Sequence, residues 1–203
     1  MKTYPTISRD IVGKPVYAFD KLDGSNIRAE WSRKRGFYKF GSRKRLLGPD
    51  DPLLGKSIQL IQDKYGDDLA RIFRKERWQK AVAFFEYHGP KSFAGWHEDD
   101  DEHTVTLFDV AADKKGILEP KPFLKIFNSV DTARLLYHGN PNSLFVDQVR
   151  EGALEGMTFE GVVCKSTLVS PGLPLMFKVK NRAWIDKLKT HCGDDDKLFE
   201  QLV

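Results

Sequence analysis

The chain has 203 residues, of which 40% are hydrophobic and 31% charged, a composition typical of a globular domain large enough to bury a core. No apolar run approaches the length of a membrane span, and the first residues lack the apolar segment of a secretory signal. Cys164 and Cys192 are the only cysteines, too few for a disulfide framework or a zinc site. We therefore expect a cytoplasmic protein without a membrane partner.

The residue pattern predicts strands and helices along the whole chain. Clusters of β-branched and aromatic residues, or their alternation with polar ones, predict strands at 16–19, 27–33, 37–41, 81–87, 104–111, 157–165 and 175–180. Apolar spacing of three and four predicts helices over 53–77, 120–127, 143–150 and 182–190. Gly66 is expected to divide the first into two helices, with Asp67 or Asp68 capping the second. Without a repeat or linker, we expect one α+β domain over residues 1–203.

The net charge of +4 is a mild basic excess that permits nucleic-acid binding without demonstrating it. Basic residues gather in four runs, at 33–35, 43–45, 71–80 and 178–189. For each run a solvated face is the simpler interpretation, and we prefer it for the helical run 71–80. The acidic run 98–102 is expected to be a solvated loop rather than a metal site, because it lacks the ligand spacing and turn glycines of a cation-binding loop.

The stretch Phe19–Asn26 places one lysine beside two carboxylates, a glycine and two short polar residues. Asp23 and Gly24 are typical of a tight turn, because glycine tolerates positive φ and aspartate hydrogen-bonds locally. Lys21 is therefore expected at the end of a buried strand, where its side chain can point into a cleft. A solvated lysine at a hairpin edge would explain K-x-D-G alone, but the longer pattern K-x-D-G-S-N is much rarer.

Further charged residues occur where strands are predicted. Glu86 lies within an apolar strand, and a glutamate is seldom buried without a partner or a task. Glu160 precedes a β-branched strand. Lys178 and Lys180 share one face of a strand, where a phosphate between them would relieve their repulsion. The simpler alternatives are a structural ion pair for Glu86, a core position for the aromatic Phe108 and solvent exposure for the two lysines.

Taken in order, these residues resemble the motifs of the covalent nucleotidyltransferases: DNA ligases, RNA ligases and mRNA capping enzymes. Lys21–Asn26 is similar to motif I, and Ser25-Asn26 resembles the RNA ligase branch, which favours an ATP-dependent RNA ligase of the phage type. Motifs III, IIIa, IV and V are matched in order by the segments around Glu86, Phe108, Glu160 and Lys178–Lys180. The resemblance covers roughly residues 17–182, and the order of the motifs makes it specific.

The resemblance implies a nucleotidyltransferase domain, in which two antiparallel sheets with flanking helices surround an ATP cleft. It implies catalytic roles for Lys21, which would form lysyl-AMP, and for Lys178 and Lys180. Adenine, sugar or phosphate contacts are implied for Asp20, Asn26, Arg43, Glu86 and Phe108, whose ring would stack on the base. Aspartate at position 20 departs from the glutamate that is usual there. A divalent cation, Mg²⁺ or Mn²⁺, would be held by Asp23 and Glu160.

The implied reaction joins RNA ends. A lysine attacks the α-phosphate of ATP only when neutral, which at neutral pH costs an ordinary lysine roughly 4 kcal/mol. We expect Lys178, Lys180 and a bound metal to lower the pKa of Lys21 by repulsion. AMP would then pass to the 5′-phosphate of an RNA, and a 3′-hydroxyl would attack and expel it.

Many relatives carry a C-terminal OB-fold that grips nucleic acid, and too few residues follow Lys180 for one to be expected here. The basic hairpin around residues 33–45, or an accessory protein, would then hold the RNA. Two alternatives stay open. One is a compact DNA ligase or capping-type guanylyltransferase with the same lysine chemistry, and the other is a nucleotide-binding module without turnover.

Overall fold

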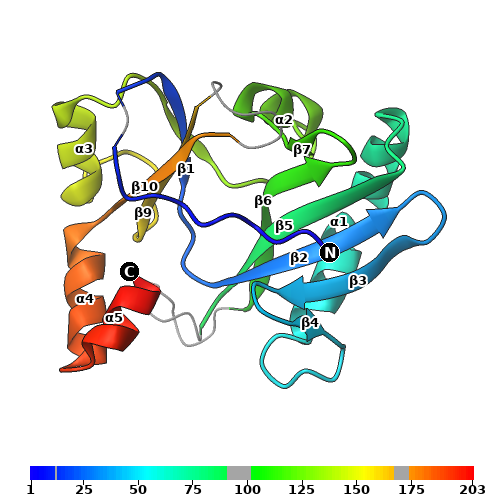
Figure 1. Ribbon diagram of the computed structural model, residues 1–203, viewed down its shortest axis with the longest axis horizontal. Coiled ribbons are helices and arrows are strands. Elements are labelled where there is room, and N and C mark those ends of the chain that lie inside the picture. The colour runs from blue at the N-terminus through cyan, green and yellow to red at the C-terminus, as the bar shows by residue number, and fades with distance from the viewer. Residues whose placement is uncertain (12, 91–101, 167–173) are drawn as a thin grey trace.

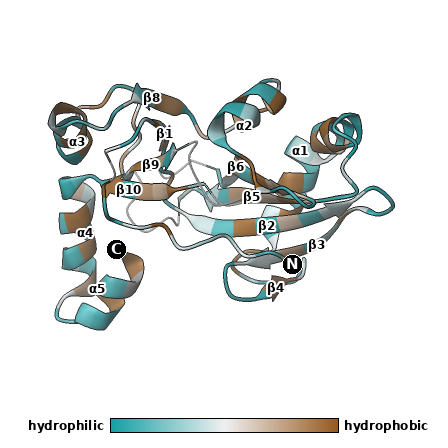
Figure 2. Cartoon of the chain, turned by 45° about the horizontal axis from the view of Figure 1, so that its top comes forward, coloured by the Kyte–Doolittle hydropathy of each residue, from teal (hydrophilic) through white to brown (hydrophobic). Residues whose placement is uncertain are grey.

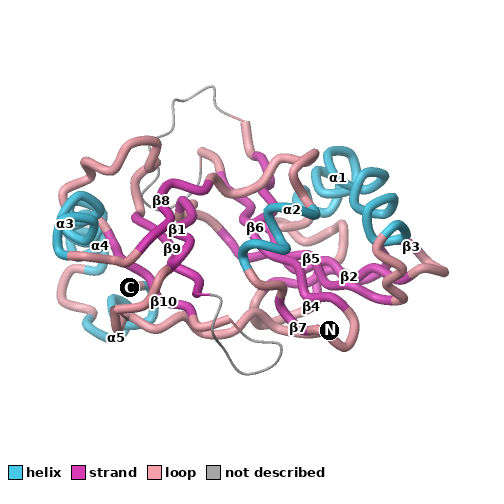
Figure 3. Tube along the Cα trace, turned by 90° about the horizontal axis from the view of Figure 1, so that it is seen from above, coloured by secondary structure: helices cyan, strands magenta, loops and turns pink. Residues whose placement is uncertain are grey.

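The structure of the protein, a computed structural model, describes residues 1–11, 13–90, 102–166 and 174–203 (Figure 1). These residues form two antiparallel sheets and five helices, which is the predicted α+β class. One sheet lies with α3, α4 and α5, and the other lies with α1 and α2, so the chain forms two halves side by side (Figure 3). Within the described residues, no helix is both long and apolar enough to cross a membrane.

The smaller sheet has the strand order β10-β9-β1-β8. Its strands are β1 (Val16–Asp20), β8 (Leu135–Gly139), β9 (Gly161–Ser166) and β10 (Met176–Lys180). Apolar side chains of β1, β9 and β10 pack against helix α3 (Ser143–Arg150) and form one core cluster. This packing fixes the ends of three strands. It thereby positions Lys21 after β1, Glu160 before β9 and Lys180 at the end of β10.

The larger sheet has the strand order β4-β3-β2-β5-β6-β7. Its strands are β2 (Ser25–Ser32), β3 (Gly36–Ser42), β4 (Leu46–Leu47), β5 (Lys80–His88), β6 (Thr104–Ala112) and β7 (Gly116–Ile117). Because strand side chains alternate between faces, Ile27, Ala29 and Trp31 of β2 join the main core under α1 (Lys56–Lys75) and α2 (Pro120–Ile126). Arg28 and Glu30 between them face the other way, where both contact Met1.

Helix α1 is continuous, so the expected division at Gly66 is wrong. The apolar side chains on either side of this glycine, Tyr65 and Leu69, are both buried in the same core, and the helix is hydrophobic on one side only (Figure 2). A glycine inside a helix costs only about 1 kcal/mol relative to alanine, which such packing outweighs. Asp67 and Asp68 are therefore interior residues of the helix and cap nothing.

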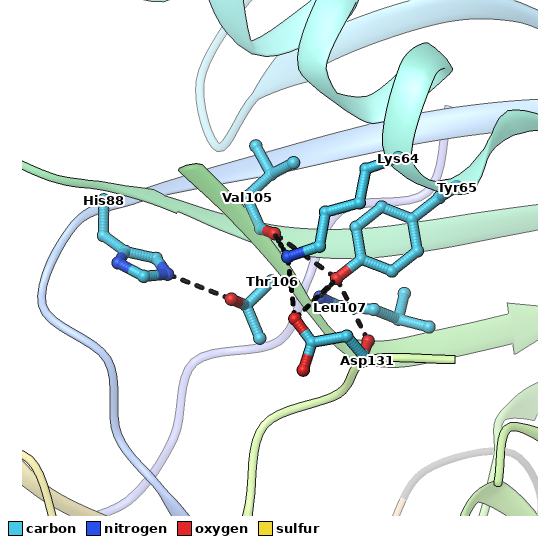
Figure 4. Close-up of polar contacts among 7 residues, drawn as sticks. All are labelled: Lys64, Tyr65, His88, Val105, Thr106, Leu107 and Asp131. Carbon is cyan, nitrogen blue, oxygen red and sulfur yellow. Dashed lines mark hydrogen bonds and ion pairs between the residues drawn. The ribbon is translucent and has the colours of Figure 1, made fainter. Parts of the chain in front are cut away.

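Polar contacts fasten α1 to β6 (Figure 4). Lys64 Nζ donates to the Val105 carbonyl at 3.1 Å and to Asp131 Oδ2 at 2.7 Å. The Tyr65 hydroxyl donates to the Asp131 carbonyl at 3.0 Å and accepts from the Leu107 amide at 3.3 Å. These bonds join the helix, the strand and the loop after α2, and so hold the sheet that carries part of the site.

The sequence analysis missed several short elements. Strands β4, β7 and β8 were not predicted, and neither was α5 (Asp196–Leu202), which packs against α4 (Arg182–Cys192). The strand predicted over 157–165 begins only at Gly161. Most of the acidic run 98–102 lies outside the described residues, so its expected loop is untested.

Candidate active site

A cavity of about 890 Å³ lies between the two sheets. Its walls come from the end of β1 and the following turn, from the start of β2, from the segment after β3, and from β5, β6, β9 and β10. Every predicted site residue except Lys180 lines it: Asp20, Lys21, Asp23, Asn26, Arg43, Glu86, Phe108, Glu160 and Lys178. Residues that are scattered over the sequence are thus gathered at one place.

Glu160 lies between two lysines. Its Oε2 accepts a hydrogen bond from Lys21 Nζ at 2.7 Å, and its Oε1 accepts one from Lys180 Nζ at 2.7 Å. The Lys21 amide also donates to the Gly161 carbonyl at 3.0 Å, which sets the end of β1 against the start of β9. The side chains of Glu160 and Lys180 are 4% and 7% exposed, whereas that of Lys21 is 22% exposed toward the cavity.

The charges in this cluster shift one another. Burial opposes ionisation of Glu160, but Lys21 and Lys180 hold its pKa below the ordinary value. Burial lowers the pKa of Lys178 to about 8, with the charge of Lys21 adding to the effect. Burial likewise lowers the pKa of Lys180 to about 8, although Glu160 opposes this.

The expected lowering of the Lys21 pKa is wrong for the chain by itself. Burial does lower it, but Glu160, Glu86 and Asp23 together raise the pKa above the usual lysine value. The sequence analysis considered the neighbouring lysines and did not foresee that a glutamate would lie directly between Lys21 and Lys180. A ligand or cation that engages these carboxylates would reverse the balance.

Glu86 and Asn26 are cross-strand neighbours on β5 and β2. Burial raises the pKa of Glu86 to about 8, with Glu160 and Asp23 adding to the effect and Lys21 opposing it. Asn26 Oδ1 is buried and has no hydrogen-bond partner among the residues that the structure describes. A buried acceptor without a partner is costly, so this atom marks a place where a ligand or water would donate a hydrogen bond.

The donors present fit a cation that is shared with a substrate. Among the described residues, no group of three or more His, Cys, Asp or Glu side chains is arranged to hold a metal ion by itself. Asp23 and Glu160 nevertheless supply carboxylate oxygens to the same cavity. Mg²⁺ is usually held by one or two carboxylates together with substrate phosphates and water, so these two residues fit that mode.

Three of the residues predicted to contact the nucleotide differ in their contacts with the rest of the protein. Asp20 Oδ1 accepts from the amide and hydroxyl of Thr158 at 3.0 Å, and its Oδ2 accepts from Arg134 Nη2 at 3.1 Å. Arg43 is exposed at the cavity wall. Phe108 is half-buried, with the edge-on ring of Tyr4 5.0 Å away between centroids. The adenine, phosphate and stacking roles of these residues stay predictions.

Lys178 and Lys180 point to the same side of β10, as their spacing predicts, since Phe177 and Val179, which alternate with them, pack on the other side in the core cluster with α3. Lys178 lines the cavity and donates to the Val203 carbonyl at 2.5 Å. Lys180 lies behind Glu160, with its Nζ 3.4 Å from the centre of the Trp184 ring. The buried lysine therefore contacts the cavity through Glu160.

The sequence analysis missed the groups that support this site. Lys165 Nζ donates to Asp109 Oδ2 at 2.8 Å and to the Phe108 carbonyl at 3.0 Å, and the Tyr4 hydroxyl donates to the same Asp109 oxygen at 2.8 Å. Both charged side chains are at most 3% exposed. Lys165 is the last residue of the motif that begins at Glu160, and Asp109 follows Phe108, so both lay within recognised segments although no role was predicted for either. Tyr4 and Trp184 lay outside the recognised segments.

This fold is similar to that of solved RNA ligase structures. An alanine mutant of Naegleria gruberi RNA ligase with ATP and manganese matches at a TM-score of 0.62 and 16% identity, covering 86% of this chain and 52% of that one. The same ligase with pyrophosphate matches at 0.61 and 16%, covering 88% and 52%. An apo mutant matches at 0.62 and 16%, covering 91% and 59%.

The chain thus has a fold similar to that of these ligase structures, and it spans a little more than half of their length. No protein-family model matches the sequence, and no curated protein sequence matches it significantly. The similarity to these ligases therefore lies in the structure and not in the overall sequence.

Proposed function

We propose that this chain is an ATP-dependent RNA ligase that adenylates itself on Lys21. The observation that carries the proposal is the position of Lys21 Nζ at the cavity wall, 2.7 Å from a glutamate whose other oxygen binds Lys180. A lysine with an adjacent carboxylate acceptor and a second cation nearby suits nucleophilic attack on a phosphate. The cavity, at about 890 Å³, is in the usual range for a small-molecule site.

In the first step Lys21 Nζ bonds to the α-phosphorus of ATP, the bond from that phosphorus to the pyrophosphate oxygen breaks, and pyrophosphate leaves. The amine must lose a proton before it attacks. Glu160 Oε2 accepts a hydrogen bond from this amine and so orients it, while the proton passes to solvent. Lys180, on the other glutamate oxygen, holds that carboxylate in place.

Lys178 lines the same cavity as Lys21. Its positive charge stabilises the negative charge on the phosphoryl group that is transferred. Asn26 Oδ1 offers an acceptor for a sugar hydroxyl. A divalent cation, Mg²⁺ or Mn²⁺, held in part by Asp23 and Glu160, would neutralise further phosphate charge when bound. Phe108 would stack on the adenine and Arg43 would contact phosphate or ribose.

In the second step a 5′-phosphate oxygen of the RNA attacks the α-phosphorus, and the bond to Lys21 Nζ breaks. In the third step the 3′-hydroxyl attacks the 5′-phosphorus, and AMP leaves with the bridging oxygen. The neighbouring ligase structures contain ATP, AMP, pyrophosphate or manganese, which are the reactant, the fragments and the kind of cation that this sequence involves. That agreement supports the proposal.

The experiment that tests it incubates the protein with α-³²P-labelled ATP and Mg²⁺ or Mn²⁺ and then separates it on a denaturing gel. We expect label on the wild-type band, none on Lys21→Ala, and normal label on Lys125→Ala, which changes an exposed lysine of α2. Adding RNA with 5′-phosphate and 3′-hydroxyl ends should discharge the label and join the ends. Absence of label, with mass spectrometry excluding AMP already attached, would leave a binding module instead.

A panel of substrates separates the related activities that use the same lysine. Labelling by GTP in preference to ATP would indicate a guanylyltransferase. Sealing of nicked DNA in preference to nicked RNA would indicate a DNA ligase.

A further inference from the structure

The end of the large sheet remote from the cavity is strongly basic. Three neighbouring turns carry seven exposed cationic side chains, here called the basic rim: Arg33, Lys34, Arg35, Arg77, Lys80, Lys114 and Lys115. The first three form the turn between β2 and β3, and the last two lie in the turn between β6 and β7. Only Glu76 and Asp113 add negative charge within these turns.

Backbone contacts hold the three turns side by side. The Arg33 amide donates to the Gln79 carbonyl at 3.0 Å, and the Asp113 amide donates to the Lys80 carbonyl at 3.1 Å. Figure 1 shows the β2–β3 turn projecting at the side of the molecule away from α4 and α5. A second cavity, of about 840 Å³, has Lys80, Lys114 and Lys115 of the rim in its lining, together with Lys2, Glu30 and Asp113. Part of the rim is therefore hollowed.

The charge of the rim is concentrated and unpaired. Its seven cations less two anions give a net charge of +5, whereas the whole chain carries +4. Within the part of the chain that the structure describes, no rim cation lies within ion-pair distance of a carboxylate. A surface built to remain solvated commonly mixes both signs, so this arrangement favours a polyanionic partner.

Two rim residues occupy a backbone conformation that disfavours them. Arg77 has φ of 60° and Lys114 has φ of 63°, and they are the only non-glycine residues with positive φ in the described ranges. Asparagine or glycine would adopt this conformation at lower cost, by about 1 kcal/mol. A functional role for the positive charge, such as binding an anion, would explain why long cationic side chains occupy both positions.

The rim and the cavity share one face of the large sheet. On β2, Asn26 faces the cavity and Ser32 lies six residues further along the same face; their cross-strand neighbours are Glu86 and Lys80. Six residues of a strand span about 20 Å. The sequence predicts that the basic runs 33–35 and 43–45 belong to one hairpin. In the structure they lie at opposite ends of β3, with Arg43 in the cavity lining and Arg33 in the turn before the strand.

We propose that the basic rim binds the phosphate backbone of the RNA substrate, about 20 Å along β2 from the site where the ends are joined. This rests on the proposed function, because RNA is the polyanion that the activity requires. Phosphate contacts position a nucleic acid without reading its sequence, which suits a ligase that joins ends of any sequence. The cavity would hold the nucleotide and the reacting ends, and the rim would hold the strand leading to them.

The test uses the full chain and a fluorescent nicked RNA duplex, with fluorescence anisotropy measured from 50 to 300 mM salt. The rim variant is Lys114→Asn/Lys115→Gln, and the control variant is Lys125→Gln/Arg150→Gln, which removes two exposed cations from α2 and α3. Each lost phosphate contact lowers the slope of log K against log salt by about 0.9. We expect the rim variant to lose between about 1 and 2 in slope and to bind about tenfold more weakly at 0.1 M salt.

Lys114→Asn relieves the positive φ, so the rim variant should unfold no earlier than wild type, and a second variant, Arg33→Gln/Lys34→Gln, guards against a folding effect. Both rim variants should label with ATP normally. Two results would overturn the proposal that the rim binds RNA: unchanged affinity and salt slope in both rim variants, or an equal loss of affinity and slope in the control variant. Absence of ATP labelling in the wild type would overturn the proposed function instead. The salt slopes would still show whether the rim binds RNA.

Discussion

Lys21 and Glu160 lie 139 positions apart in the sequence, yet their Nζ and Oε2 atoms are 2.7 Å apart. The other oxygen of the same carboxylate binds Lys180. One buried anion therefore pairs with two lysines, of which Lys21 lies at the cavity wall and Lys180 behind the glutamate. Three strands of the small sheet, β1, β9 and β10, meet at this carboxylate.

Replacing Glu160 with glutamine should destabilise the fold. The amide keeps the shape but leaves two lysines, one of them almost fully buried, without their anion. Removing one partner of a buried ion pair costs about 3–5 kcal/mol, and release of a proton from Lys180 would bring the cost toward the lower end. We expect a loss of about 3 kcal/mol in urea unfolding, together with loss of ATP labelling.

Glu151→Gln is the matched control, because Glu151 pairs with Arg182 and both side chains are more than half exposed. An exposed pair contributes 0–1 kcal/mol, so this variant should unfold within about 0.5 kcal/mol of wild type. Equal stability losses in the two variants would contradict a special role for the buried cluster.

The pair Asp109 and Lys165 should show strong energetic coupling. Their side chains are 1% and 3% exposed and join β6 of the large sheet to β9 of the small one. Asp109→Asn alone leaves a buried ammonium with only neutral partners and should cost about 3–5 kcal/mol. The double variant Asp109→Asn/Lys165→Met should cost clearly less than the two single variants together, by about 1–3 kcal/mol.

Urea unfolding of the four proteins in this cycle gives the coupling directly. Additivity within about 0.5 kcal/mol would mean that the pair contributes nothing beyond its separate side chains. The same variants also test support of the site, since Lys165 binds the Phe108 carbonyl. We expect Lys165→Met to raise the ATP concentration required for half-maximal labelling.

The sequence predicted the long elements and the members of the site, for physical reasons that differ. Nearly continuous apolar runs predicted β5 and β6 closely, because both faces of these strands are buried, and apolar spacing of three and four predicted α3, which buries one face. The two-residue strands β4 and β7 lack any period, and α5 is defined by packing on α4 rather than by its own pattern. These elements depend on tertiary contacts that a single sequence does not display.

Within the site, residue types were predictable and their electrostatics were not. The motif order placed Lys21 and Glu160 together, but the sequence did not show that Glu160 would lie between two lysines. Nor did it show that, against the effect of burial, Glu160, Glu86 and Asp23 would together raise the pKa of Lys21. The sign of a pKa shift depends on which charges are nearest, and that follows from the register of β1, β9 and β10.

Cys164 should make the stability depend on alkaline pH. Burial raises the pKa of its thiol from 9.0 to about 12. Between these values the unfolded chain releases a proton that the folded chain retains, so stability is full below pH 9 and falls as pH rises, by about 1.4 kcal/mol per pH unit. The contribution ends near pH 12, where the folded thiol also ionises.

Urea unfolding at pH 8, 9 and 10 checks this, with Cys164→Ala as the comparison. Alanine leaves a small cavity whose cost does not depend on pH. The wild type should therefore lose about 1 kcal/mol more than the variant between pH 9 and 10. Parallel losses in the two proteins would assign the alkaline sensitivity to other groups.

Two glycines should respond in opposite ways to the addition of one methyl group. A Cβ at Gly66 would have no heavy atom within 4 Å, whereas a Cβ at Gly24 would lie 2.3 Å from the Tyr87 carbonyl oxygen of β5. Gly66→Ala should stabilise α1 by about 0.5–1 kcal/mol, since alanine is the better helix former. Gly24→Ala must push the turn after β1 away from β5.

That displacement should reach the site, because Gly24 follows Asp23 and lies three residues after Lys21. We expect Gly24→Ala to lose at least about 1 kcal/mol of stability and most of the ATP labelling, since small displacements of a reacting group are costly. Gly66→Ala, measured by the same unfolding and labelling assays, should label as wild type does. Full labelling by Gly24→Ala would show that the turn can move without displacing Lys21. It would contradict the close approach of this turn to β5 as the feature that positions Lys21.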